Sequence, residues 1–404
     1  MKTNTSVSLR NVALYKWFMP FSEPLFWGPI LIQTLMNLGK MTLPEIYYME
    51  SIVIIILIVL NIPAGSLADV IGRKKTLIIG QFFLLASCIG FAFMSTPWQA
   101  WFANVLWAIG FSFQNSSLRA LIYNTLKNHG CEKSYAEICG CANGYRFITA
   151  AICALAVSPL AIINLRLPLY LCIPFLVIPL VVSFFFIEER TTEKYEASKQ
   201  IKVIKDAVIM VCKTPQLWWI IGFVSLIGGA SKLWFFTYNP YFEGVGIELK
   251  YYGYVFCCLN LVAWYFCRNA AKIETHLSER ICVIAMILCI GIPILLMGLF
   301  PLGFMVSMVL VQNVVRGFMT PFTDNYVNKH IDSEGVRATV LSAKSTFTDS
   351  FASLALIGFG LVNSNLGLFE SLIILGVTVL VLGFFSYLQY QRLFLKTKLV
   401  SGSK

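Results

Sequence analysis

Long apolar runs divide this chain, and each has the length that a helix needs to cross a bilayer, roughly 18–25 residues. Inside hydrocarbon, every backbone N–H and C=O group must be satisfied within the protein, so only helices and closed β-barrels span membranes. Barrel strands would alternate apolar and polar residues over about 10 positions, whereas these runs are continuous. The pattern therefore predicts an all-α integral membrane protein.

The composition excludes a soluble globular protein. Of the 404 residues, 58% are hydrophobic and 13% are charged, whereas a soluble domain carries about 25% charged residues. The mean hydropathy of +0.74 leaves no room for a wetted surface. The net charge of +11 would suit nucleic acid in a soluble chain. In so apolar a chain, membrane topology explains the basic residues better, so we expect the lipid bilayer, and no nucleic acid, as a partner.

The polar breaks between the runs predict about twelve transmembrane helices. The first run contains Lys16 and Glu23 and has no small-residue cleavage site, so it is predicted to be a membrane span rather than a signal peptide. The predicted spans are residues 14–37, 46–66, 76–95, 99–122, 145–164, 168–187, 216–238, 252–270, 281–300, 303–322, 341–362 and 367–390.

Basic residues gather on one side of these spans. The opposite loops hold little beyond Lys40, Arg166 and Lys250. This asymmetry is the positive-inside pattern, and it predicts an even number of spans with both termini in the cytoplasm.

The longest polar segment, residues 188–214, separates six predicted spans from the next six. We therefore predict an N-terminal six-helix bundle at 1–187, a cytoplasmic linker at 188–214 and a C-terminal six-helix bundle at 215–404. Two such bundles are typical of transporters that are built from repeated halves.

A glycine-rich basic motif follows the second predicted span, where residues 65–75 read GSLADVIGRKK. Gly65 would let two helices approach closely, and Asp69 could accept charge-assisted bonds from a helix N-terminus or from an arginine. Gly72 permits a tight turn. Arg73 and Lys74 would meet anionic headgroups.

This motif resembles the loop signature G-x-L-A-D-x-x-G-R-[RK]-x of the major facilitator superfamily, at the same place in the chain. Residues 61–65, 120–126 and 337–342 resemble further segments of a bacterial efflux branch of that family, which includes microcin-type secretion proteins. The resemblance implies two six-helix bundles in the bacterial cytoplasmic (inner) membrane. It also implies a monomer and a cytoplasmic gate formed by the motif.

Asp324, at the end of the tenth span, and Arg337, before the eleventh, fall where the resemblance implies a second cytoplasmic gate.

Several ionisable residues lie inside the predicted spans, where a charge costs several kcal/mol, and we take four of them as candidate functional residues. Desolvation would favour the protonated form of Glu23 in the first span and Asp349 in the eleventh, which makes both candidate proton carriers. Lys232 and Arg316 would suit an anionic or zwitterionic substrate. The alternative for all four is a structural ion pair with a neighbouring helix.

A candidate substrate wall is formed by Trp27 in the first span and by Trp234, Tyr238 and Asn239 in the seventh. Glycine and proline residues interrupt these two spans, and corresponding irregular helices in the two halves indicate a substrate site. Bulk packing is the alternative fate for the aromatic residues.

The sequence contains no enzyme signature: neither a phosphate-binding Gly-rich lysine loop nor a Ser-His-Asp arrangement is present. His129, Cys131, Cys139 and Cys141 are irregularly spaced, so we interpret them as residues of a short polar loop and predict no metal site. We therefore expect a protein that is not an enzyme and needs no cofactor.

Three functions remain open. The first is proton-coupled, or alternatively sodium-coupled, efflux of a small-molecule or peptide-like substrate, such as a drug-like or self-produced antibiotic compound. The second is ion-coupled import of a small nutrient, and the third is a non-transporting membrane sensor.

Overall fold

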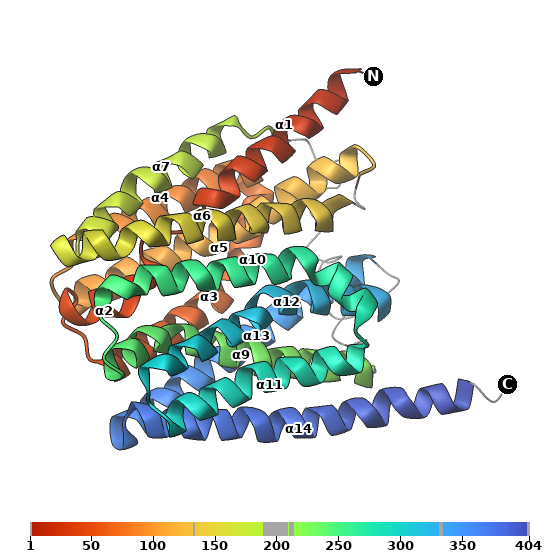
Figure 1. Ribbon diagram of the computed structural model, residues 1–404. Coiled ribbons are helices and arrows are strands. Elements are labelled where there is room, and N and C mark those ends of the chain that lie inside the picture. Colours follow the sequence, from red (N-terminus) through yellow and green to blue (C-terminus); the bar gives the residue numbers. More distant parts are fainter. Residues whose placement is uncertain (1, 132–133, 189–208, 210–213, 331–333, 402–404) are drawn as a thin grey trace. The chain divides into compact units, whose positions relative to one another are not determined.

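The computed structural model describes residues 2–131, 134–188, 209, 214–330 and 334–401. All regular structure in these ranges is helical, and no strand occurs among them (Figure 1). The prediction of an all-α protein is therefore confirmed for the part of the chain that is described. Most of the predicted linker, 188–214, lies outside the described residues, so the predicted domain boundaries stay a prediction.

The chain forms two compact units, Met1–Tyr195 with Gly246–Trp264, and Glu196–Val245 with Tyr265–Lys404. Helix α10 (Tyr252–His276) begins in the first unit and ends in the second. The other helices of the first unit are α1 (Lys2–Phe18), α2 (Leu31–Asn37), α3 (Leu43–Ile71), α4 (Arg73–Phe93), α5 (Pro97–Asn128), α6 (Tyr135–Ile163) and α7 (Leu167–Phe185). Those of the second unit are α9 (Pro215–Gly244), α11 (Glu279–Leu299), α12 (Ser307–His330), α13 (Glu334–Leu366) and α14 (Leu368–Ser401).

Among the described residues, nine helices are long and apolar enough to cross a membrane. The predicted spans that are missing from these nine are the first, the fourth and the eighth. The first is broken, the fourth (α5) carries the buried amides Asn104 and Gln114, and the eighth (α10) carries Arg268 and Lys272. Polar and charged residues of this kind lower the mean hydropathy of a helix.

The first predicted span is not one helix. Helix α1 ends at Phe18, a 3₁₀ turn covers Met19–Phe21, and a second 3₁₀ turn at Gly28–Ile30 leads into α2. Pro20, Pro24 and Pro29 fall in or beside the break, and each removes a backbone donor and clashes with a continuing helix. The predicted loosening of this span is confirmed, and Glu23 lies within the break.

Two other expectations about regular structure are wrong. The seventh span is not interrupted, because α9 runs continuously through Gly228, Gly229 and Pro240. Cys139 and Cys141 are not loop residues, because α6 already begins at Tyr135. Among the described residues, no group of three or more His, Cys, Asp or Glu side chains could hold a metal ion.

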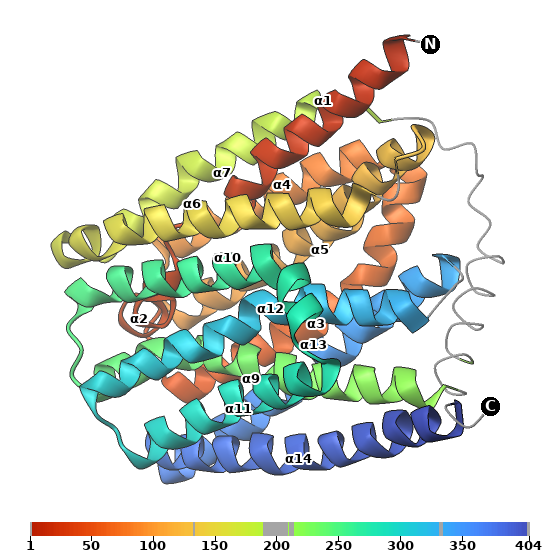
Figure 2. The same ribbon diagram turned by 45° about the vertical axis from the view of Figure 1, so that its right-hand side comes forward.

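Glycines allow close helix contacts in each unit. In the first unit, a Cβ on Gly110 of α5 would lie 2.8 Å from the carbonyl oxygen of Gly80 on α4. In the second unit, the antiparallel helices α11 and α14 lie side by side (Figures 1 and 2). Glycines leave no room for a Cβ between them, namely Gly291 and Gly298 of α11 and Gly376 of α14. Small residues allow such packing where lipid supplies no hydrophobic drive for helix association.

Gly376→Ala should therefore destabilise the second unit. Its new Cβ would lie 2.6 Å from the backbone nitrogen of Leu295, which cannot move aside cheaply. Overpacking of this kind costs about 1–3 kcal/mol, so the melting temperature of the purified protein in detergent should fall.

Gly358→Ala in α13 is the matched control, because nothing lies within 4 Å of its added Cβ. That variant should melt at or slightly above the temperature of the unchanged protein, since alanine favours a helix over glycine by about 1 kcal/mol. Equal melting temperatures for the two variants would contradict the packing described for α11 and α14.

Candidate functional site: paired charges within the helices

Glu23, at the break in the first span, forms an ion pair with Arg146 of α6, whose Nη1 donates to the Glu23 Oε1. Helix α6 packs directly against the 3₁₀ turn Met19–Phe21, which brings the two side chains together. Both are partly shielded from solvent, with 40% and 26% of the side chains exposed. The Arg146 Nε is buried without a hydrogen-bond acceptor. The pair therefore joins an irregular, proline-containing backbone to a regular helix.

Arg146 was not among the candidates from the sequence. It is the second residue of the predicted span 145–164, so the rule that selected Glu23 applied to it as well. A basic residue at the edge of a predicted span is easily assigned to membrane topology instead. The alternative interpretation of Glu23, an ion pair with a neighbouring helix, describes its geometry in this structure.

Trp27 lies four residues beyond Glu23 and is half-buried. Its ring packs on Phe91 of α4 with a centroid distance of 4.2 Å, and its Nε1 donates to the Thr34 Oγ1 at 3.1 Å. These contacts fix the indole within the first unit, so its role in a substrate wall stays a prediction.

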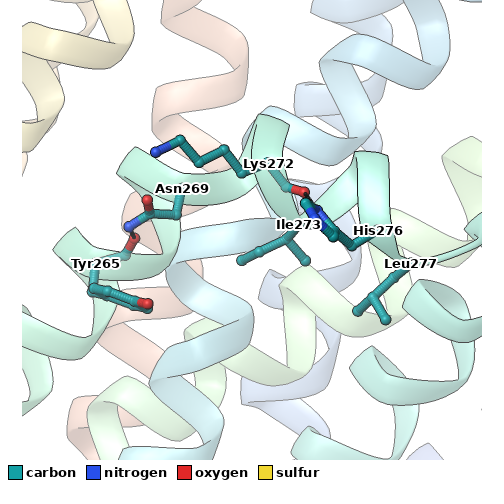
Figure 3. A pocket seen from close by; sticks show the side chains of 6 residues that line it. All are labelled: Tyr265, Asn269, Lys272, Ile273, His276 and Leu277. Atoms are coloured by element: carbon teal, nitrogen blue, oxygen red, sulfur yellow. Dashed lines mark hydrogen bonds between the residues drawn. The ribbon is translucent and has the colours of Figure 1, made fainter.

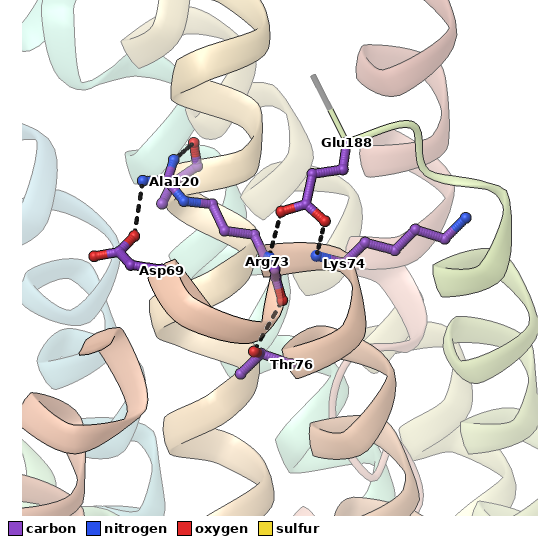
Figure 4. Close-up of polar contacts among 7 residues, drawn as sticks. Asp69, Arg73, Lys74, Thr76, Ala120 and Glu188 are labelled. Atoms are coloured by element: carbon purple, nitrogen blue, oxygen red, sulfur yellow. Dashed lines mark hydrogen bonds and ion pairs between the residues drawn. The ribbon is translucent and has the colours of Figure 1, made fainter. Parts of the chain in front are cut away.

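The motif at 65–75 lies where α3 ends and α4 begins (Figure 4). Asp69 and Arg73 form an ion pair of 3.3 Å, and the Arg73 Nη1 donates to the carbonyl oxygen of Ala120 on α5 at 3.0 Å. Arg73 thus connects three helices. The predicted bond between Asp69 and an arginine is present.

Glu188, which follows α7, holds the first turn of α4 and was not predicted. Its carboxylate accepts from the backbone nitrogens of Arg73 and Lys74, the latter at 3.3 Å (Figure 4). Unpaired N–H groups and the positive end of the helix dipole make this position favourable for an anion. Gly72 has φ +102°, and a Cβ there would lie 2.7 Å from the Glu188 Oε2. Glycine is therefore required both by the backbone conformation and by the carboxylate.

The other end of α4 is held by Arg166, which precedes α7. Its guanidinium donates to the carbonyl oxygens of Ala92 and Met94 at 2.8 and 2.7 Å. A cation at the C-terminus of a helix complements the negative end of the dipole. Residues on either side of α7 therefore cap both ends of α4 with charges of the appropriate sign.

Gly65 does not play the packing role that we expected. A Cβ at this position would have nothing within 4 Å among the described residues. The expectation that it brings two helices together is therefore wrong for this structure.

In the second unit, Lys232 of α9 pairs with Asp349 of α13, with the Lys232 Nζ 2.5 Å from the Asp349 Oδ1. The two helices approach closely at Gly228, one turn before Lys232 on α9, where an added Cβ would lie 2.8 Å from the Cγ2 of Thr348 on α13. The glycines of the seventh span therefore position an ion pair rather than break the helix. The sequence selected both residues but assigned them separate roles.

Asp324 of α12 pairs with Lys344 of α13, whose ammonium also donates to the Thr323 Oγ1 at 3.0 Å. The predicted gate partner of Asp324 was Arg337. The side chain of Arg337 lies outside the described residues, so that pairing stays a prediction. Helix α13 thus carries both Lys344 and Asp349, which pair with different neighbouring helices.

Arg316 of α12 lies over the ring of Phe235, with its Cζ 5.6 Å from the ring centroid, a cation–π contact between α12 and α9. Its Nη1 donates to the Asn313 Oδ1 at 3.4 Å, and the Asn313 Nδ2 donates to the Tyr238 hydroxyl at 3.0 Å. Arg316, Asn313 and Tyr238 form one polar connection in a largely apolar unit.

Trp234 and Asn239 are 0% and 1% exposed, and Tyr238 is 3% exposed. The Trp234 ring packs against Tyr238 and Tyr241 at centroid distances of 5.5 and 6.2 Å. All of these side chains lie in the packed core of the second unit. A substrate could meet them only in another conformation, so their role in a substrate wall stays a prediction.

Comparison with known proteins identifies the family. A family model described as Major Facilitator Superfamily matches residues 12–356. No curated protein sequence matches the chain significantly.

Several solved structures share the fold. The nucleoside transporter NupG has a TM-score of 0.74 at 15% sequence identity, covering 95% of this chain and 99% of that chain. A bacterial homolog of the human lysosomal transporter Spinster, inward-facing and unoccupied, has a TM-score of 0.76 at 13% identity, covering 97% and 98%. A D-xylose-proton symporter has a TM-score of 0.69 at 11% identity, covering 95% and 96%. The likeness confirms the predicted fold class.

Gly72→Ala should destabilise the loop between α3 and α4, whereas Gly65→Ala should not. Alanine at φ +102° and ψ 140° is strained by about 1–3 kcal/mol, and its Cβ would push against the Glu188 carboxylate. The melting temperature in detergent should fall for Gly72→Ala alone. Equal effects of the two substitutions would contradict the capping of α4 by Glu188.

Lys232→Gln and Asp349→Asn should not have additive effects on the free energy of unfolding. Breaking a fully buried pair costs roughly 3–5 kcal/mol. Because the Lys232 side chain is 44% exposed, we expect a coupling energy nearer to about 1 kcal/mol in a double-mutant cycle. A control cycle that combines Lys250→Gln with Asp349→Asn should be additive, because Lys250 is an exposed lysine that pairs with Glu248. A coupling energy no larger in the test cycle than in this control would contradict the assigned contact between Lys232 and Asp349.

Proposed function

This chain belongs to the Major Facilitator Superfamily and is a transporter rather than an enzyme, and we propose that it exports a drug-like or self-produced antibiotic compound in exchange for protons. A peptide antibiotic of the microcin type falls within this substrate class. The family argues against the non-transporting sensor that the sequence left open.

The observation that carries the proposal is the ion pair between Glu23 and Arg146 at the break in the first span. A carboxylate inside hydrocarbon is tolerated when an opposite charge stabilises it. A proton that binds Glu23 removes that charge, and the attraction between the two side chains is then lost. Since an arginine side chain stays protonated at all physiological pH values, the carboxylate is the member of the pair that can accept a proton.

This chemistry can couple two fluxes. When Glu23 is ionised, a cationic group of the substrate can bind its carboxylate in place of Arg146. A proton that binds Glu23 removes the negative charge and releases the substrate group, so proton and substrate compete for one site and move in opposite directions. A ligand shifts a conformational equilibrium only through such differential interactions with its states.

The break in the first span supports a mobile role for Glu23. Helical backbone satisfies its own hydrogen bonds, whereas Ser22–Trp27 does not follow a regular helix. Non-helical backbone at membrane depth is tolerated where protein surrounds it or where it lines a polar cavity. A carboxylate on such a segment can change position without breaking a helical turn.

The second unit supplies a second candidate proton carrier, Asp349, which is paired with Lys232. A cationic group of the substrate could replace the Lys232 ammonium at Asp349 in the same manner as it replaces Arg146 at Glu23. Each unit therefore holds one carboxylate for which a proton and the substrate can compete, which favours a substrate with a cationic or zwitterionic part.

We further propose that the protein works as a monomer in the bacterial inner membrane with both termini in the cytoplasm. The distribution of basic residues supports this orientation. Protons are the proposed coupling ion, and sodium is the alternative.

Import of a small nutrient is the second candidate function. Two of the proteins with the same fold are described as a nucleoside transporter and a D-xylose-proton symporter. In that case proton and substrate would move in the same direction, and the same ion pairs would serve.

Glu23→Gln should abolish proton-coupled transport without unfolding the protein, because glutamine keeps the shape and loses the titratable proton. Everted membrane vesicles with an acidified interior and a pH-sensitive dye report coupling directly. A panel of cationic, zwitterionic and peptide antibiotics should contain compounds that release protons from vesicles with the unchanged protein. The variant should lose this response at least tenfold.

Glu248→Gln removes an exposed carboxylate and is the matched control, which should keep full activity. Full proton release with Glu23→Gln would disprove the coupling role. Uptake of nucleosides or xylose into right-side-out vesicles, with no response to the antibiotics, would support the importer instead.

A further inference from the structure

A shallow pocket of about 260 Å³ lies along the last three turns of α10, within the second unit (Figure 3). Its lining residues follow the helical period, so they share one face. They are Tyr265, Asn269, Lys272, Ile273, His276 and Leu277. Neither the proposed transport mechanism nor the gate motif uses any of them.

The polar side of the pocket presents groups suited to an anion. The His276 Nδ1 lies 2.8 Å from the carbonyl oxygen of Lys272, which can only accept, so this nitrogen carries a proton and Nε2 is the nitrogen left to bind a ligand. Among the described residues, no ion pair is found for the Lys272 ammonium. The nearby carboxylate of Glu274 accepts a 2.6 Å hydrogen bond from Asn325 of α12.

The other side of the pocket is apolar and exposed. Leu277 is 40% exposed and Tyr265 is 55% exposed, and Ile273 lies between them on the helix (Figure 3). A free inorganic anion would gain nothing from this apolar side. A molecule with an anionic head and an apolar chain would use both.

The pocket lies at the end of α10, just before Ser278 caps the start of α11, a helix that is long and apolar enough to cross a membrane. Arg280, in the first turn of α11, donates to the Tyr387 hydroxyl of α14 at 2.5 Å. Tyrosine and basic side chains together are typical of the level of the lipid headgroups. An anionic headgroup at that level attracts each nearby basic residue by about 1 kcal/mol.

We propose that this pocket binds an anionic phospholipid. Its phosphate pairs with the Lys272 ammonium and accepts a hydrogen bond from Nε2 of the imidazolium form of His276, while an acyl chain lies over Ile273 and Leu277. The lipid would bind to one face of α10 in the second unit and would be retained on purification.

Native mass spectrometry of the purified protein tests this assignment, with dioleoyl phosphatidylglycerol and dioleoyl phosphatidylcholine as the added lipids. The unchanged protein should retain phosphatidylglycerol in preference. Lys272→Ala should weaken its binding about fivefold, as expected for the loss of one cation at the headgroup. The double variant Lys272→Ala/His276→Ala should weaken it further.

Lys250→Ala is the matched control, because it removes an exposed lysine from the 3₁₀ turn Leu249–Tyr251 that precedes α10. This variant should retain phosphatidylglycerol as the unchanged protein does. All variants should keep the same melting temperature in the absence of lipid, because the exposed side chains of Lys272 and His276 do not pack in the core.

Two results would overturn the proposal. One is equal retention of phosphatidylglycerol by the double variant and the unchanged protein. The other is displacement of the lipid by inorganic phosphate at the same concentration, because it would show a site for a free anion rather than for a lipid.

Discussion

A charge inside hydrocarbon is stable only beside an opposite charge, and this constraint governs the polar structure of both units. Glu23 is held by Arg146, and Asp349 is held by Lys232. Each pair joins segments that are far apart in the sequence, so it contributes to packing as well as to charge balance. Because a single proton removes one member's charge, the same contact that stabilises one arrangement of helices can release it.

The ends of a helix carry unpaired N–H and C=O groups and the partial charges of the helix dipole. In α4, these groups are bound by residues on either side of α7. Glu188 accepts from the first N–H groups of α4, and Arg166 donates to its last carbonyl groups. The motif at 65–75 is therefore one part of a larger assembly, in which Gly72 leaves room for a carboxylate. Glu188, the first residue of the predicted linker, therefore contacts the motif at 65–75.

Residue types and periodicity were enough to predict the all-helical architecture, the break at Pro20 and Pro24, and the ionisable residues inside spans. They could not predict which residues would pair, because Glu23 and Arg146 are 123 positions apart and nothing local specifies their contact. The burial of Trp234 was equally hidden, since aromatic residues in a membrane helix can face lipid, a cavity or the core. Gly65 shows the same limit, because a small residue permits a close helix contact without requiring one.

The central claim is that Glu23 gains and loses a proton, and infrared difference spectroscopy tests it most directly. Purified protein in lipid vesicles would be taken from high to low pH, and the carbonyl stretching region of protonated carboxyl groups would be recorded. The account predicts a band that grows as pH falls and is missing from the spectrum of the Glu23→Gln variant. An unchanged set of carboxyl bands in that variant would contradict it.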